Sequence, residues 1–150
     1  MTPIVSADAW RVLVTEIVNE FGEDCFNLGF DIGLKIAEFL SYKFPFHLDE
    51  LSLKLKMVST ELWSRIFINE PLTQLPSPAP SCVIWESAEL HWLKPLPCDS
   101  HEPLPAAINT AHFFAGILQG GLKAFGVEAT VSANLDKIPV CKFVCVLDAM

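Results

Sequence analysis

The stretch FFAGILQGGLKAFGVEATVSANLDKIPVCKFVCVL, residues 113–147, changes from a helical to a strand-like hydrophobic period near its middle. In the first part the apolar residues recur at spacings of three and four, which predicts a helix over residues 108–125. Gly126 is well placed to end that helix. Apolar and polar residues then alternate over 127–135 and again over 141–147, as they do in half-buried strands. The stretch therefore predicts a helix followed by an antiparallel hairpin.

Three more helices are predicted upstream from apolar residues at helical spacing. The first covers about residues 8–21 and ends at Gly22, the second covers about 24–42, and the third covers about 48–67. Each has a broad apolar stripe with charged residues on the other side. These segments supply the helical layer of the predicted fold.

The segment between the third and fourth helices is rich in proline. Residues 70–81 and 95–105 are predicted to contain no regular element, because proline cannot donate a backbone hydrogen bond. Between them, 82–86 and 89–94 are predicted to form a short hairpin. The whole order predicts one α+β domain over residues 1–150, with about four helices on one side of a roughly four-stranded antiparallel sheet.

Composition excludes several classes of function. With 10 basic and 18 acidic side chains the net charge is −8, so nucleic-acid binding and docking on an anionic membrane are both disfavoured. The uncharged run 103–122 contains prolines and polar residues and is a poor membrane span. The N-terminal sequence lacks the basic and apolar regions of a secretory signal. Five irregularly spaced cysteines indicate a reducing compartment. We therefore expect a soluble, acidic, cytosolic domain.

No set of residues predicts catalysis, a metal site or a cofactor. Cys141 and Cys145 share a strand face, but we expect both thiols to be packed as small apolar side chains. Histidines do not occur at metal-ligand spacing near them; they are His47, His91, His101 and His112. A thiol or hydrolytic enzyme that uses Cys25, Cys98 or Cys141 remains an open alternative.

The helices carry more apolar and glycine surface than a small sheet can cover. Two helices contain glycines one turn apart, a pattern found where another backbone approaches closely. We therefore expect a second protein to pack on the first two helices, the alternative being a self-contained core. The expected interface residues are Val14, Ile17, Val18, Phe21, Gly29, Phe30 and Gly33. On this expectation Gly33→Leu abolishes pairing and leaves a soluble chain.

Several motifs resemble one family. The C-terminal stretch is similar to the C-terminal half of subunit 6 of the transport protein particle, the TRAPP vesicle-tethering complex. The motif Leu28-Gly29-Phe30-x-x-Gly33 resembles the glycine-bearing helix of all small TRAPP subunits. The matching positions elsewhere are Trp63, Gly116, Gly120, Gly121, Leu122, Pro139, Cys141, Lys142 and Phe143. The chain departs from the family at Gln119, where arginine is usual, and at Asn134, where an acid is usual.

The resemblance implies a non-catalytic scaffold on the small TRAPP fold, in which helices cover a twisted four-stranded antiparallel sheet. It implies a heterodimer with TRAPP subunit 3, contacts with other small TRAPP subunits and, indirectly, a Rab GTPase that the complex activates by nucleotide exchange. The implied location is the cytoplasmic side of cis-Golgi and endoplasmic-reticulum membranes. The acyl-binding sister subunit has a cysteine where this chain has Lys43-Phe44-Pro45-Phe46, so acylation is not carried over.

Two points stay open at this stage. The chain either forms a homodimer or stays monomeric when its partner is absent. A free-standing hydrophobic-ligand-binding domain of the same fold is the alternative function, because related folds in prokaryotic regulators use an internal apolar pocket.

Overall fold

The computed structural model describes residues 13, 16–18, 20–43, 51–63, 72–77, 79, 81–87, 105–137 and 140–148. The described residues before Gly22 are helical and belong to the first predicted helix, called here the N-terminal helix. The elements that follow are η1 (Gly22–Asp24), α2 (Cys25–Lys43), α3 (Leu51–Lys56), the π-helical segment η2 (Met57–Leu62), β1 (Thr73–Leu75), β2 (Cys82–Ser87), α5 (Pro105–Ala124), β3 (Ala129–Lys137) and β4 (Val140–Leu147).

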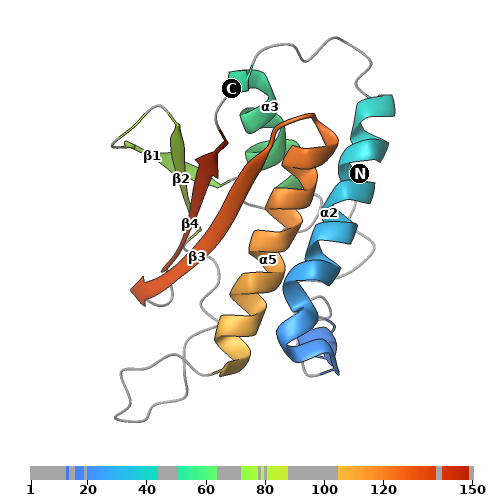
Figure 1. Ribbon diagram of the computed structural model, residues 1–150, viewed down its shortest axis with the longest axis vertical. Helices are drawn as coiled ribbons and strands as arrows, with labels where there is room; N and C mark the ends of the chain where they lie inside the picture. The colour runs from blue at the N-terminus through green and yellow to red at the C-terminus, as the bar shows by residue number, and fades with distance from the viewer. Residues whose placement is uncertain are drawn as a thin grey trace, which may run out of the picture.

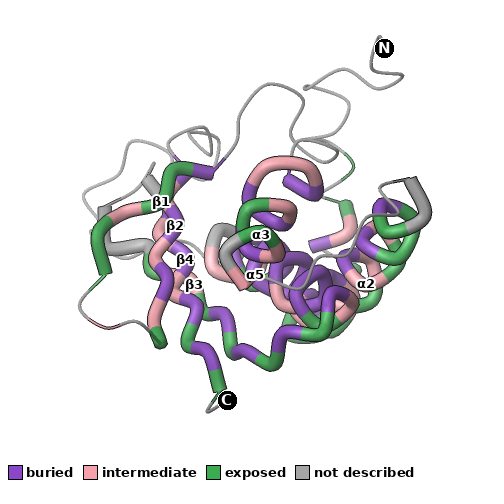
Figure 2. Tube along the Cα trace, turned by 90° about the horizontal axis from the view of Figure 1, so that it is seen from above, coloured by how far each residue is buried: buried purple, intermediate pink, exposed green. Residues whose placement is uncertain are grey.

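The helices and strands form three layers. The sheet lies on one side, α5 packs against it, and α2 lies on the far side of α5 (Figures 1 and 2). Consistent with this central place, the residues of α5 from Thr110 to Leu122 are buried except for His112, which is exposed, and Gln119, which is partly exposed. The face of α2 that points away from α5 is therefore the outer surface of the helical layer.

The four strands form one antiparallel sheet in the order β1-β2-β4-β3, which confirms the predicted fold class. Burial alternates along β2 and β4: Trp85 and Phe143 are opposite each other and both face the helices. In the neighbouring row Ile84 and Val144 are partly exposed on the other face. This alternation arises because only one face of the sheet is covered by helices.

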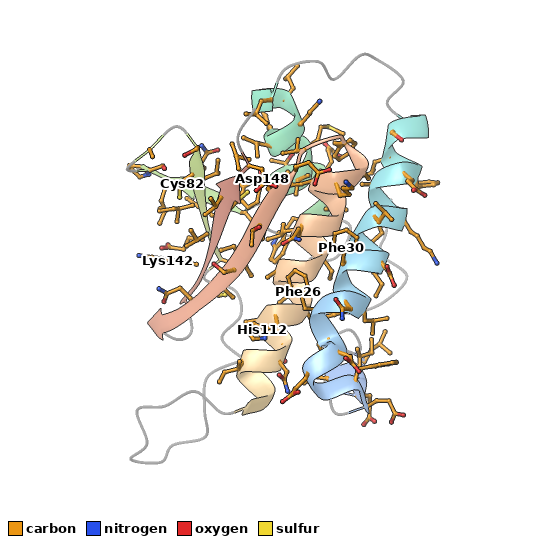
Figure 3. All side chains as sticks on the ribbon, in the orientation of Figure 1. Phe26, Phe30, Cys82, His112, Lys142 and Asp148 are labelled. Atoms are coloured by element: carbon orange, nitrogen blue, oxygen red, sulfur yellow. The ribbon has the colours of Figure 1, made fainter. Side chains whose placement is uncertain are left out.

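Glycines allow α2 and α5 to approach at backbone distance. A Cβ atom added at Gly29 or Gly33 would lie closer than 3 Å to a backbone carbonyl oxygen of α5. A Cβ added at Gly116 or Gly120 would meet a carbonyl oxygen of α2 in the same way. The two helices thus present glycine pairs to each other, and Figure 3 shows Phe26 and Phe30 on the side of α2 next to α5.

The third predicted helix is present over all of its described part, residues 51–63, but its second half is a π-helix. The carbonyl of Ser59 accepts a hydrogen bond of 3.0 Å from the backbone N–H of Leu72, so this segment holds the chain that leads into β1. Leu62 packs against Gly121, where a Cβ would collide with its side chain. Periodicity alone does not distinguish the π-helix from an α-helix.

Two predictions about strands need correction. Residues 73–75 were expected to be irregular, but they form the edge strand β1, which pairs with β2 from Thr73 opposite Glu86 to Leu75 opposite Ile84. Prolines flank this three-residue strand without interrupting it, as is common at sheet edges. Strand β2 pairs with β1 and β4, and the expected partner 89–94 lies outside the described residues.

The predicted helix ends at Gly22 and Gly126 are confirmed. Both glycines have positive φ, 50° and 83° respectively, a conformation that side chains disfavour. After Gly126 the chain turns back so that β3 packs against α5.

Candidate functional site

Large apolar side chains are exposed on the N-terminal helix and on α2. Leu13 on the N-terminal helix is 49% exposed, Phe21 at the end of that helix is 44% exposed, and Phe39 on α2 is 60% exposed. Ile17 lies between Leu13 and Phe21 in helical spacing and is half-buried against the core. Because α5 separates α2 from the sheet, neither the sheet nor α5 covers these side chains. We call Leu13, Ile17, Phe21 and Phe39 the outer apolar surface.

The predicted interface residues fall into different environments. Phe21 is exposed, whereas Ile17 and Phe30 are partly buried. Val18 belongs to the core, and its carbonyl oxygen lies 4.0 Å from the sulfur of Cys25. Val14 lies outside the described residues. Phe21 is therefore the residue of this set that is most available to a partner.

Gly29 and Gly33 have a role within the chain in place of the expected role at a partner interface. Both are buried against the backbone of α5, so their open side is already occupied. The glycine pair of α2 and the glycine pair of α5 face each other and not a second protein. Gly33→Leu is consequently expected to disrupt the domain itself, and not only its pairing.

Leu13 and Phe39 were not among the predicted interface residues, although both lie on predicted apolar stripes. Phe39 is two positions after Ala37, which is fully buried, and one position before Leu40, which is also fully buried. Helix α5 packs on the face of α2 that carries Gly29 and Gly33, and Phe39 remains exposed. The sequence alone does not show which face α5 covers.

Among the described residues of the motifs that resemble the family, Trp63, Cys141 and Phe143 lie in the core between α5 and the sheet. Trp63 makes edge-to-face contacts with Phe114 and Phe143, with ring centroids 6.0 and 5.5 Å apart. Cys141 is buried on the same sheet face. Lys142 lies on the other face of the sheet (Figure 3), where Glu86 of β2 is its cross-strand partner. Pro139 lies outside the described residues.

Gln119, a departure from the family pattern, fastens the edge strand to α5. Its side-chain oxygen Oε1 accepts a hydrogen bond of 2.9 Å from the backbone N–H of Val131 on β3. Strand β3 is the edge of the sheet next to α5, so this bond satisfies a donor that no neighbouring strand reaches. The substitution thus has a structural role within the monomer.

Cys25, Cys141 and Cys145 are poor nucleophiles in this structure. Burial raises the pKa of Cys141 and of Cys145 to about 12, with the Cys82 charge as a smaller cause at Cys145. Burial, and secondarily Asp24, raises the pKa of Cys25. A thiol with a raised pKa remains protonated near neutral pH and does not supply a thiolate. Cys98 lies outside the described residues.

We expect Cys141 and Cys145 to resist alkylation by iodoacetamide at pH 8 in the folded chain, since both thiols are buried and protonated. In urea both should react within minutes, as free cysteines do. Peptide mass spectrometry of the two samples measures this difference. Fast modification of either residue in the folded chain would revive the thiol-enzyme alternative.

Neither a metal-binding cluster nor a spanning helix occurs in the part of the chain that the structure describes. No three His, Cys, Asp or Glu side chains in the described ranges converge as metal ligands. His112 is exposed on α5 (Figure 3). No described helix is both long enough and apolar enough to cross a bilayer. The outer apolar surface is the candidate functional site.

Comparison with known proteins identifies the family to which the chain is similar. Residues 10–146 match the family model described as transport protein particle (TRAPP) component. Human trafficking protein particle complex subunit 6A is 27% identical over 120 residues, which are 80% of this chain and 74% of that protein. The zebrafish (Danio rerio) subunit 6b is 24% identical over 124 residues, 83% of this chain and 77% of its own.

Among solved structures, trafficking protein particle complex subunit 3 from Naegleria fowleri, covalently bound to palmitic acid, is similar with a TM-score of 0.65. The alignment covers 95% of this chain and 93% of that chain at 13% identity, so it shows a shared fold alone. In this chain the segment 44–50 that follows α2 lies outside the described residues.

Proposed function

Since the chain belongs to the family of transport protein particle (TRAPP) components, we propose that it is a non-catalytic scaffold subunit of a TRAPP vesicle-tethering complex. It acts by pairing with a sister subunit through the N-terminal helix and the outer face of α2. The observation that carries the proposal is the outer apolar surface, where Leu13, Phe21 and Phe39 are between 44% and 60% exposed. Large apolar side chains that a folded domain leaves exposed are candidates for an interaction surface.

The proposed partner is TRAPP subunit 3, with other small TRAPP subunits as further neighbours in the assembly. The similarity to curated subunits 6A and 6b supports this choice, because it makes a subunit 6-like position in the complex the natural one. In that position the chain supports the nucleotide-exchange activity of the complex toward a Rab GTPase in transport from the endoplasmic reticulum to the Golgi. It acts on the cytoplasmic side of those membranes.

Of the interface residues predicted from the sequence, the proposed interface includes Ile17 and Phe21, and Val14 stays a prediction. Leu13 and Phe39 are added because they are exposed. Val18 and Phe30 are left out of the exposed interface, since Val18 is in the core and Phe30 is partly buried. The glycines of α2 are excluded, because α5 already covers them.

The double substitution Phe21→Ala and Phe39→Ala is expected to weaken binding to subunit 3 of the same organism about 100-fold. Truncating buried aromatic anchors at an interface costs about 2 kcal/mol or more each at the best sites, and the effects are not additive. Isothermal titration calorimetry with purified subunits measures the change. Circular dichroism should show unchanged secondary structure, since both side chains are exposed in the monomer.

Leu53→Ala is the matched control. Leu53 is also a large exposed side chain, 42% open, but it lies on α3 and outside the proposed interface. We expect less than a threefold change in affinity for this variant, as for an ordinary surface substitution of about 0.5 kcal/mol. Equal losses for the control and the double variant, or none for the double variant, would place the interface elsewhere.

A further inference from the structure

Carboxylates lie beside the part of the outer apolar surface that the N-terminal helix supplies. Glu16 and Glu20 are exposed on the N-terminal helix. Glu16 is one helical turn after Leu13, and Glu20 is one turn after Ile17. Glu23 and Asp24 are exposed in η1, directly after Phe21. These side chains lie at the turn between the N-terminal helix and α2. The apolar centre therefore has an acidic border on at least this side.

The outer face of α2 continues this charge. Asp31 and Glu38 are exposed there, and Glu38 precedes Phe39. Lys35 is the cation among the side chains described between Leu13 and Ser41. The ion pair formed by Lys123 and Glu128 is at the opposite end of the chain, at the turn between α5 and β3. Within the described residues, no ion pair neutralises the carboxylates of Glu16, Glu20, Glu23, Asp24, Asp31 or Glu38.

This charge distribution disfavours a second copy of the chain as the occupant. Packing two copies face to face through the same surface would bring the carboxylates of one copy near those of the other. Like charges brought together at an interface oppose association, whereas complementary charges speed it and suppress incorrect partners. The net charge of −8 adds to this repulsion between copies.

We propose that the outer apolar surface selects a protein partner whose docking face carries lysine or arginine around an apolar centre, and that its acidic border discourages self-pairing. This inference rests on the proposed function and specifies the chemistry of the partner at the same surface. The apolar side chains supply affinity, and the border carboxylates set the rate and the choice of partner. Exposed charges of this kind act at long range and are screened by salt.

The test compares two charge-neutralised variants. Glu20→Gln with Glu23→Gln removes two carboxylates at the border of the surface. Glu128→Gln with Asp148→Asn removes two exposed carboxylates elsewhere, so both variants have the same net charge. Stopped-flow mixing with subunit 3 of the same organism measures the association rate constant at 50 mM and 500 mM NaCl.

We expect the border variant to associate about five- to tenfold more slowly than the unmodified chain at 50 mM NaCl, and the control less than twofold more slowly. At 500 mM NaCl the difference should vanish, because the Debye length falls to a few ångströms. Sedimentation of each chain alone should show tighter self-association of the border variant than of the control.

The outcomes separate this inference from the proposed function. If subunit 3 binds with association rates that are the same for both variants at low salt, pairing stands and the charge selection is overturned. If subunit 3 does not bind at any salt concentration, the proposed pairing fails, and sedimentation decides the charge inference. In that case tighter self-association of the border variant supports it, and equal self-association of the two variants contradicts it.

Discussion

Replacing Gly33 by alanine should lower the free energy of unfolding by about 3 kcal/mol, the upper part of the range for overpacked sites. The added methyl group would lie closer than 3 Å to three backbone atoms of Ile117, the carbonyl oxygen, the carbonyl carbon and Cα. Backbone atoms of a buried helix cannot move aside as a flexible side chain can. The helices must therefore separate, and their contact is lost along its length.

The expected loss of stability in Gly33→Ala is opposite in sign to what helix propensity predicts. In an open helix, alanine is more favourable than glycine by about 1 kcal/mol, so propensity alone predicts a gain in stability. Urea unfolding followed by circular dichroism gives the free energy for Gly33→Ala and for Asn27→Ala, an exposed control on the same helix. We expect the control to change by less than about 0.5 kcal/mol. A more stable Gly33→Ala chain would show that α2 and α5 are not packed at backbone distance.

The second large effect is expected at Trp63. This side chain is 1% exposed and packs edge to face on Phe114 of α5 and Phe143 of β4, so it joins the helical layer to the sheet. Trp63→Ala should cost about 3–5 kcal/mol, as other large-to-small changes in cores do. In a domain of this size that corresponds to a fall of roughly 6–20 °C in Tm.

Trp63→Phe is the matched variant, since it keeps an aromatic ring and removes less volume. It should retain at least half of the stability that the alanine variant loses, because part of the ring packing remains. Differential scanning calorimetry of the two variants measures the order. If both variants lose the same amount, or if Trp63→Ala loses less than about 1 kcal/mol, Trp63 does not connect the layers.

The elements predicted correctly are those that bury one face along their length. Strand β4 places Cys141, Phe143 and Cys145 on the covered face, and the alternation is visible in the sequence. Helix α5 is also visible, although its hydrophobic character extends around most of its surface because it lies between two layers. The spacing of hydrophobic residues along the sequence indicates burial of this kind.

The features that were missed depend on contacts between distant segments. Three residues of β1 are too few to show a period, and their pairing with β2 is a tertiary event. Strand β2 also pairs with β4, which is more than fifty residues away in the sequence, and no local pattern predicts that pairing. The same holds for the candidate site. The glycine pairs on two helices are evident in the sequence. Only the packed layers show that Gly33 faces Ile117 and that Phe39 is exposed.

Hydrogen–deuterium exchange on the chain alone and in complex with subunit 3 tests most directly where the partner docks. We expect slower exchange in the complex for peptides covering the N-terminal helix and the outer face of α2, from Leu13 to Ser41. Peptides from β2 and β4 should be unchanged, because the sheet lies on the far side of α5 (Figure 1). Protection confined to the sheet, or no protection in a complex that forms, would contradict pairing through the helical layer.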